Sequence, residues 1–299
     1  MSYIIHLLIY FDIYVIVALS LNLVVGYCGL LTLSHASFYA VGAYAYAILS
    51  LVLGWDILPI IFTAIVVGAA LSLLLSIMAW RLRGDFFVLA SLAVQSIVFG
   101  LIYNWSDGSS PLGSWNNFTN GAFGIASIDR PKIFQFVLTD STHFLIFATI
   151  VTGLCALIVW RLCSSPWGQS LIAMREDELA ARSLGKNTKL LKVQALAIAS
   201  GMVAVAGTLY AGYVSYIDVS SASLDENILM LSMVIVGGLG NIRGPIIGAI
   251  AIILIPEFLR FLDISHELAA NFRLAIYGLL LVLMMHFRPQ GIGGEYRLE

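Results

Sequence analysis

Long apolar stretches follow one another along most of this 299-residue chain. An α-helix needs about 20 apolar residues to cross the hydrocarbon layer of a membrane. Stretches of that order lie at 3–25, 30–53, 57–80, 86–105, 143–163, 193–214, 228–240, 245–262 and 272–287. Since backbone polar groups inside lipid must be hydrogen-bonded within the segment, these stretches predict helices. The sequence therefore predicts an all-α, polytopic membrane protein with about eight or nine spans, forming a single transmembrane domain over 1–299.

The composition supports this assignment, because 60% of the residues are hydrophobic and only 11% are charged. Soluble domains carry about 25% charged residues. The net charge of −2 offers no basic surface, so membrane lipid and not nucleic acid is the expected surrounding. The first apolar stretch lacks the basic start and the small-residue cleavage site of a signal peptide, which predicts a retained span.

Two glycine-rich breaks interrupt the apolar stretches, at Gly26–Gly29 and at Gly237–Pro245. Non-helical backbone cannot face lipid, so each break must be buried in protein or line water. Breaks in corresponding parts of two halves of a transporter are the usual sign of a translocation pathway. If either break is a re-entrant turn, the number of membrane crossings changes between even and odd. The span count alone therefore does not determine on which side of the membrane the N-terminus lies.

The basic residues divide into two groups along the predicted spans. Eleven of the fifteen lie in the turn at 81–83, the segment 161–192, Arg243 and the tail after 287. Because short cytoplasmic loops are enriched in Lys and Arg, these places, and with them the C-terminus, are predicted to be cytoplasmic. The loop at about 106–142 is then outside, and its Gly, Ser, Asn and Pro residues indicate irregular structure. By the same counting, we expect the opening segment inside the cell.

The segment 164–192 is polar, with seven charged residues in the stretch 175–189. Pro166 is tolerated in a first helical turn, and Gly185 is a typical helix stop. This pattern predicts one amphipathic helix over 167–184. Its apolar residues recur at helical spacing and are expected to face one way: Leu171, Met174, Leu179 and Leu184.

Three lysines follow that predicted helix and are expected at the membrane boundary, near anionic headgroups: Lys186, Lys189 and Lys192. An ordinary solvated loop helix, held by weak surface ion pairs, is an alternative interpretation of the segment. A phosphate-binding loop ending at Gly185-Lys186 is excluded, because Ala180 replaces the required glycine and Asn187 the required Ser or Thr.

The segment also matches a longer pattern, Gly168-x-x-Leu171-x-Ala173-x-Arg175-Glu176-Asp177-Glu178-x-Ala180-Ala181-x-x-x-Gly185. This pattern resembles the cytoplasmic coupling loop of ABC importer permeases, and more narrowly that of the branched-chain amino acid permeases. Four further blocks are similar to the same family, in the same order: Leu21–Leu49, Leu82–Ile97, Val234–Ala249 and Arg288–Gly294.

The resemblance implies that a helix in this segment docks into a cleft of a separate ATPase subunit. Seven residues would make the coupling surface: Arg175, Glu176, Asp177 and Glu178 for specificity and register, and Ala180, Ala181 and Gly185 for close approach. No cofactor is expected on this chain, because ATP and Mg²⁺ would bind two cytoplasmic ATPase subunits. The other implied partners are a periplasmic substrate-binding protein and a second, homologous permease, as a heterodimer or else a homodimer, in the bacterial inner membrane.

Small and polar residues near the two breaks are the candidates for a translocation pathway. They are Asn22, Gly26, Gly29, Ser34, His35, Ser91, Gln95, Gly237, Gly238, Gly240 and Asn241. Ordinary helix packing explains the glycines equally well, and His35 has the alternative of a buried neutral histidine with one partner.

The expected function is therefore that of a permease subunit of an ATP-driven importer, for branched-chain or other hydrophobic amino acids. Urea and short amides are alternative substrates, since close relatives within the resembled family handle them. An ion-coupled secondary transporter is the alternative from another class; few carboxylates in the apolar stretches argue against it. The chain has no metal motif, no catalytic residues and no nucleophile–base pair, so it is not expected to be an enzyme.

Overall fold

The computed structural model describes residues 2–82, 84–134, 136–260, 266–288 and 290–293. Six of the described helices are long and apolar enough to cross a membrane. They are α1 (Ser2–Asn22, continued by the π-helical turn η1, Leu23–Tyr27), α2 (His35–Leu53), α3 (Ile57–Arg81), α4 (Asp85–Asn104), α5 (Ser141–Cys163) and α8 (Thr188–Val214). The bundle is completed by α9 (Leu224–Gly237), α10 (Arg243–Arg260) and α11 (His266–Phe287). The predicted all-α polytopic fold is confirmed.

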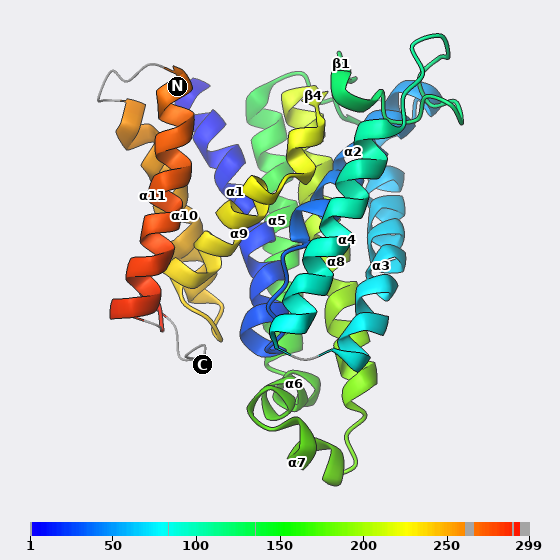
Figure 1. Cartoon of the computed structure of the whole chain (residues 1–299). Coiled ribbons are helices and arrows are strands. Elements are labelled where there is room, and N and C mark those ends of the chain that lie inside the picture. The colour runs from blue at the N-terminus through cyan, green and yellow to red at the C-terminus, as the bar shows by residue number, and fades with distance from the viewer. Residues whose placement is uncertain (1, 83, 135, 261–265, 289, 294–299) are drawn as a thin grey trace.

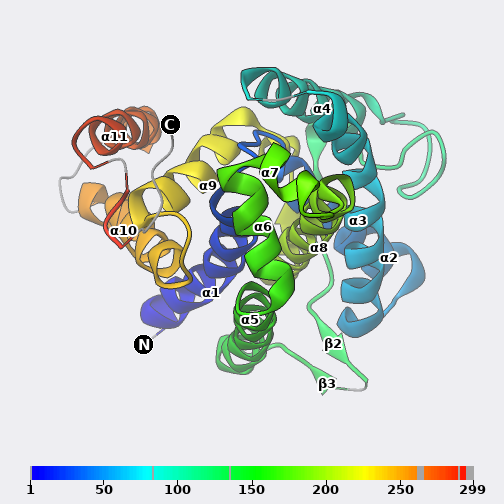
Figure 2. The same cartoon turned by 90° about the horizontal axis from the view of Figure 1, so that it is seen from below.

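Helix α8 lies inside the bundle, against α2 and α3 (Figures 1 and 2). Small residues allow this position, because they let backbones approach closely. A Cβ at Gly42 of α2 would overlap the carbonyl oxygen of Ala204, and a Cβ at Gly207 of α8 would overlap that of Tyr39. By contrast, the outer helices expose large apolar side chains such as Phe62 and Ile150, which suits contact with lipid.

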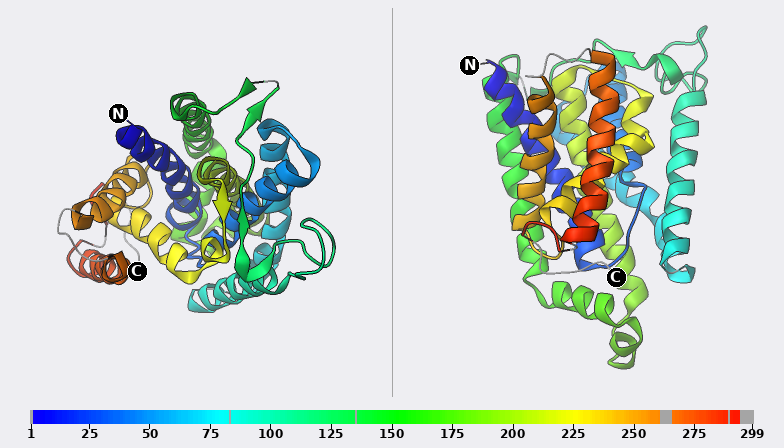
Figure 3. Two further views of the ribbon diagram at one scale, coloured as in Figure 1. Left: turned by 90° about the horizontal axis from the view of Figure 1, so that it is seen from above. Right: turned by 60° about the vertical axis from the view of Figure 1, so that its left-hand side comes forward.

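The chain crosses the bundle repeatedly, and its connections gather at two opposite ends (Figure 3). At one end lies the loop between α4 and α5, which contains η2 (Gly121–Phe123) and three two-residue strands, together with a fourth such strand that follows α8. Strand β1 (Ile125–Ala126) pairs antiparallel with β4 (Tyr216–Ile217), and β2 (Lys132–Ile133) with β3 (Phe136–Val137). The short helices α6 (Pro166–Glu176) and α7 (Glu178–Ser183) lie at the opposite end.

The predicted division of the basic residues agrees with these two ends. The end of α3 at Arg81, the α6–α7 region and the start of α10 at Arg243 lie toward one end, whereas Arg130 and Lys132 belong to the loop end. Arg83 and Arg297, which were assigned to the first group, lie outside the described residues.

The expectation that the opening segment lies on the same side as the segment 164–192 is wrong, because α1 begins at the loop end, opposite α6 and α7 (Figures 1 and 3). The chain turns back at the first break, so α1 and α2 run in opposite directions. Gly26 at the end of α1 contacts Arg175 of α6, whereas Tyr46 of α2 donates to the carbonyl of Asp129 in the loop. The basic residues could not reveal this, because the first Lys or Arg of the sequence is Arg81.

Both predicted breaks are present, and they place helix ends inside the bundle. After η1 the chain is non-helical until His35, so α2 begins five residues later than the apolar stretch from Leu30. Helix α9 follows β4 and the 3₁₀ turn η3 (Val219–Ala222), has 14 residues, and ends before the turn at 238–242.

The close contact of α2 and α8 gives a direct test of the fold. Changing Gly207 to Ala should destabilise the protein by about 1–3 kcal/mol, because the added methyl group overlaps the Tyr39 carbonyl and the two helices must separate. Thermal unfolding of the purified protein in detergent measures the effect. Gly153→Ala on α5 is the matched control and should leave the unfolding temperature unchanged or slightly raised, since no atom lies within 4 Å of its added Cβ. Equal stability of the two variants would contradict the packing.

Candidate functional site

The polar segment forms two helices that meet at Asp177, so the prediction of one helix over 167–184 is wrong. Asp177 has extended backbone angles, φ −150° and ψ 104°, and ends α6. Its carboxylate accepts hydrogen bonds from the amides of Leu179 and Ala180, at 2.8 and 3.0 Å. Asp is among the preferred residues for capping a helix N-terminus, and here it begins α7 instead of continuing α6. We call the pair α6–α7 the elbow.

The elbow separates the apolar residues that were expected on one face. Leu171 and Met174 of α6 are buried against the bundle, whereas Leu179 is 66% exposed and Leu184 is 80% exposed. The reason is the bend at Asp177, which breaks the helical period between the two pairs. The exposed apolar surface of the elbow is thus formed by α7 and the turn after it.

Helix α6 is fixed to the bundle end at several points (Figure 2). Ser165 caps it, with its hydroxyl accepting from the amide of Gly168 at 3.5 Å, and α6 begins at Pro166, one residue before the predicted helix. The indole of Trp167 donates to Oε1 of Gln194 on α8 at 2.8 Å. These contacts hold α6 across the end of the bundle.

Arg175 connects α6 to the first break. Its Nη1 donates to the carbonyl oxygen of Gly26 at 2.5 Å, and its side chain is only 9% exposed. Gly29 has φ +72°, and a Cβ there would lie 2.7 Å from Cγ of Arg175, so this turn needs glycine for both its conformation and its space. The predicted coupling group and the predicted pathway group therefore touch at Arg175.

Glu178 connects α7 to α8. Its Oε1 accepts from Nη2 of Arg182 at 2.5 Å and from the Thr188 hydroxyl at 3.1 Å, and its Oε2 accepts from Nζ of Lys192 at 3.1 Å. Lys192 also donates to the carbonyl of Ala79 at the end of α3, at 3.3 Å. The expectation that Lys192 meets lipid headgroups is wrong, because its side chain is buried among these partners.

The same contacts determine the charge of Glu178. Burial by itself raises the pKa of a carboxyl group, but the hydrogen bonds and positive charges of Lys192 and Arg182, with the Thr188 hydroxyl, lower the pKa of Glu178 below its ordinary value. The carboxylate is therefore ionised at neutral pH.

The seven predicted coupling residues thus divide into two sets. Arg175, Glu178 and Ala181 are buried or partly buried against the rest of the protein, and four are exposed: Glu176, Asp177, Ala180 and Gly185. Leu179 and Leu184 complete the exposed surface. They were not among the predicted coupling residues, although their apolar spacing in a charged segment was the available signal.

The two breaks lie against each other and are joined through Asn22. Its Nδ2 donates to the carbonyl of Asn241 at 2.8 Å, and its Oδ1 accepts from the amide of Gly240 at 3.2 Å. Asn241 in turn accepts from the amide of Gly244 at 2.6 Å. A Cβ at Gly237 would overlap the Gly244 carbonyl, so α9 and α10 meet directly beside this turn, which also contains Gly238 at φ +108°.

The start of α2 collects most of the other predicted pathway residues. A helix N-terminus leaves its first amides without partners, and here side chains of other helices accept from amides in the first turn of α2 and just before it. Ser91 Oγ accepts from the amide of Leu33 at 2.9 Å, and Gln95 Oε1 accepts from that of Ser37 at 3.1 Å. Asn227 Oδ1 accepts from the amide of Ala36 at 2.8 Å.

Ser34 and His35 lie at the same place and are buried. The Ser34 hydroxyl is hydrogen-bonded to that of Thr32 at 2.9 Å, and His35 Nε2 to that of Ser20 at 2.9 Å. Sequence reasoning missed Asn227, which accepts from the Ala36 amide in the first turn of α2. The signal was an amide residue immediately before the apolar stretch 228–240.

Membrane-length apolar helices with buried polar breaks and a projecting elbow define a multi-pass helical membrane protein. Over residues 3–285 the chain matches the family described as the permease component of branched-chain amino acid transport systems. The chain belongs to this family.

Three relatives are similar over nearly the whole chain. The high-affinity branched-chain amino acid transport system permease protein LivM of Escherichia coli K12 is 32% identical, with 94% of this chain and 67% of LivM covered. The probable LivM of Methanocaldococcus jannaschii is 28% identical, with 96% and 92% covered. The permease protein LivH of E. coli K12 is 25% identical, also with 96% and 92% covered. No solved structure matches the chain.

The Glu178–Lys192 pair can be tested by a double-mutant cycle. Glu178→Gln should lower stability by about 3 kcal/mol, because it leaves Lys192 buried without a counter-charge. Adding Lys192→Met should recover part of that loss, since the unpaired charge is then removed. Lys186→Met is the control and should have little effect, as Lys186 is exposed. Additive single effects, measured by thermal unfolding, would show that the pair does not act as a unit.

The lowered pKa of Glu178 also predicts a pH dependence. The pKa of Glu178 is lower in the folded state than in the unfolded state, where it is about 4.3. Such a group stabilises the protein at pH values above the unfolded-state pKa, and this contribution is lost as the pH falls through the folded-state pKa. The difference in stability between wild type and Glu178→Gln should therefore be largest at neutral pH. It should shrink below about pH 4.3. A difference that stays constant down to pH 3 would contradict the assignment.

Proposed function

We propose that this chain is a pore-forming permease subunit of an ATP-driven importer, which takes up branched-chain or other hydrophobic amino acids delivered by a periplasmic binding protein. The observation that carries the proposal is the elbow. It presents Leu179 and Leu184 to water at the bundle end that is rich in basic residues, while Arg175 and Glu178 connect it to the membrane helices. An exposed apolar ridge with flanking charges is what an ATPase cleft requires.

The elbow offers two routes by which movement of α7 would reach the membrane helices. Glu178 and Lys192 transmit it to α8 and α3. Arg175 transmits it to the end of α1, and Asn22 carries it on to the turn between α9 and α10. ATP and Mg²⁺ would act on two separate cytoplasmic ATPase subunits, so this chain itself needs no cofactor.

The placement in the cell follows from the basic residues. The end with α6, α7, Arg81 and Arg243 is assigned to the cytoplasm of a bacterium, together with the end of α11. The loop between α4 and α5 and the start of α1 then face the periplasm, where a binding protein would dock. The protein would lie in the inner membrane.

The pore requires a second permease. Similarity to both LivM and LivH of one organism supports a partner that is homologous but different, so a heterodimer is proposed. The names of these relatives favour branched-chain amino acids as the substrate class over urea and short amides.

Exchange of the elbow's exposed leucines tests the proposal. Leu179→Asp with Leu184→Asp should abolish ATPase binding and ATP-driven uptake while leaving the folded protein intact, because both side chains are exposed. Gln169→Asp, an exposed change on α6, is the control and should bind normally. Charge reversal at Arg175 and Glu178 is a poor probe, because it would break the contacts inside the protein described above.

Binding and uptake are measured with the purified chain, candidate ATPases, the second permease and a binding protein in liposomes. The proposal fails if no ATPase binds the unaltered chain. It also fails if uptake continues without ATP in a proton gradient, which would indicate an ion-coupled transporter.

A further inference from the structure

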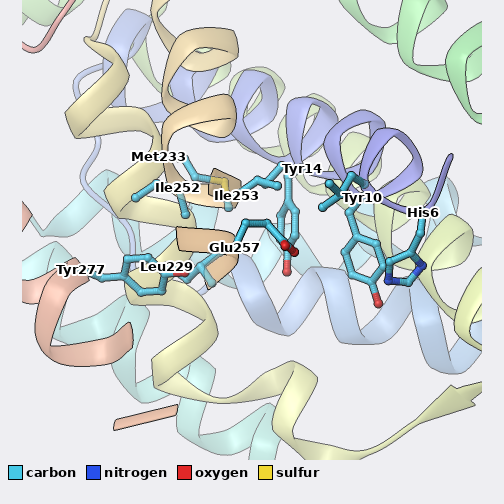
Figure 4. Close-up of a pocket in the computed structure, with 10 residues that line it drawn as sticks. His6, Tyr10, Tyr14, Leu229, Met233, Ile252, Ile253, Glu257 and Tyr277 are labelled. Atoms are coloured by element: carbon cyan, nitrogen blue, oxygen red, sulfur yellow. The ribbon is translucent and has the colours of Figure 1, made fainter. Parts of the chain in front are cut away.

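A cavity of about 270 Å³ lies between α1, α9, α10 and α11 (Figure 4). One side is aromatic and polar, with His6, Tyr10 and Tyr14 from α1, Glu257 from α10 and Tyr277 from α11. In Figure 4 the side chain of Glu257 extends from α10 toward Tyr14 and Tyr10. The rest of the wall is apolar, as on Leu229 and Ile252. The cavity is therefore amphipathic, with one acidic, aromatic corner.

A second carboxylate adjoins this corner. Glu226, in the first turn of α9, accepts from the Tyr14 hydroxyl at 3.4 Å. Further tyrosine rings lie beside Tyr10. The ring centroid of Tyr210 is 6.2 Å from that of Tyr10, in an edge-to-face arrangement, and 5.6 Å from that of Tyr39. Two carboxylates and several aromatic rings thus share one region between the helices.

Neither carboxylate has a basic partner in the described part of the chain, since no Lys or Arg there pairs with Glu226 or Glu257. The hydroxyl of Tyr39, whose ring lies 5.6 Å from that of Tyr210, also lacks a partner among the described residues and is almost fully buried. Carboxylates enclosed between helices are usually paired with a positive charge, so this region has capacity to hold a cation.

The chemistry of that cation follows from the wall. Aromatic faces attract cations, and a primary ammonium can donate three hydrogen bonds to carboxylates and hydroxyls. The apolar remainder of the cavity suits a short hydrocarbon chain attached to the ammonium. A volume just below the usual range of about 300–1,000 Å³ for ligand pockets favours a small molecule.

We propose that this cavity binds the ammonium group of a small apolar amine or amino acid, with Glu226 and Glu257 as counter-charges and Tyr10 and Tyr14 as aromatic wall. Where the ligand is a transported amino acid, this inference rests on the proposed function. The same ammonium chemistry is present in the ethanolamine headgroup of a phospholipid, so the experiment separates the two sources.

The test uses the full chain in nanodiscs without ethanolamine lipid, with isopentylamine as probe and isovalerate as the matched acid that lacks the ammonium. Isopentylamine should bind at least about tenfold more tightly than isovalerate. Glu226→Gln with Glu257→Gln should weaken amine binding at least about tenfold. Asp225→Asn, an exposed change beside Glu226, should alter it less than about twofold. Amine binding that survives the double variant, or equal binding of isovalerate, overturns the site.

A second pair of variants covers the case in which loss of both carboxylates prevents folding. Tyr10→Leu should weaken amine binding and Tyr10→Phe should retain it, because the aromatic face and not the hydroxyl attracts the cation. Equal binding by these two variants overturns the aromatic wall.

Two further arms identify the ligand. Displacement of isopentylamine by L-leucine assigns the site to amino acids, whereas displacement only by added phosphatidylethanolamine assigns it to lipid; either outcome supports the ammonium site. ATP-driven leucine uptake by the complete transporter is measured separately. Absence of uptake with normal amine binding overturns the proposed function alone, and normal uptake with no amine binding overturns this site alone.

Discussion

The constraint on which the structure depends is that no backbone amide or carbonyl can stay unpaired inside the hydrocarbon layer. Regular helices meet it by themselves, but α2 begins inside the bundle and cannot. Side chains from two other helices supply acceptors there: Gln95 from α4 and Asn227 from α9 for the first turn of α2, and Ser91 from α4 for the amide of Leu33 just before it. The interruption of the helix is therefore possible only because α4 and α9 lie against it, and the packing of these helices is coupled to the break.

Backbone groups in the second break are also hydrogen-bonded by a side chain, and that side chain, Asn22, lies beside the first break. Asn22 uses both ends of its amide on the turn at 238–242, so neither break is independent of the other. Close approach makes this geometry possible, since Gly237 and Gly244 leave no side chain between α9 and α10. The polar residues near the breaks thus have a structural task whether or not a substrate passes them.

The sequence allowed the apolar helices, both breaks and the position of the elbow to be predicted, because each depends on local composition. It did not reveal which surface the elbow exposes, since the preference of Asp177 for a helix start competes with an otherwise continuous helical pattern. The prediction that Lys192 lies near lipid headgroups was wrong for a different reason. Its partners, Glu178 and the Ala79 carbonyl, are brought to it by tertiary packing, and charge in a sequence does not distinguish a paired lysine from a solvated one.

The elbow is connected to the bundle through Glu178 and through Arg175, and these two residues contact different helices. A movement of the elbow would therefore be transmitted to two parts of the bundle. Glu178 and Lys192 connect α7 to α8, and α8 is in backbone contact with α2 at Gly42 and Gly207. Helices in such contact cannot slide without a clash, so α2 and α8 must move together. Arg175 connects α6 to the end of α1 instead. Because α2 is the next helix after the first break, a displacement of the elbow under the proposed function would reach both sides of that break. The non-helical stretch between Tyr27 and His35 joins these two parts of the bundle. Its conformation would therefore have to accommodate the displacement of α1 on one side and of α2 on the other.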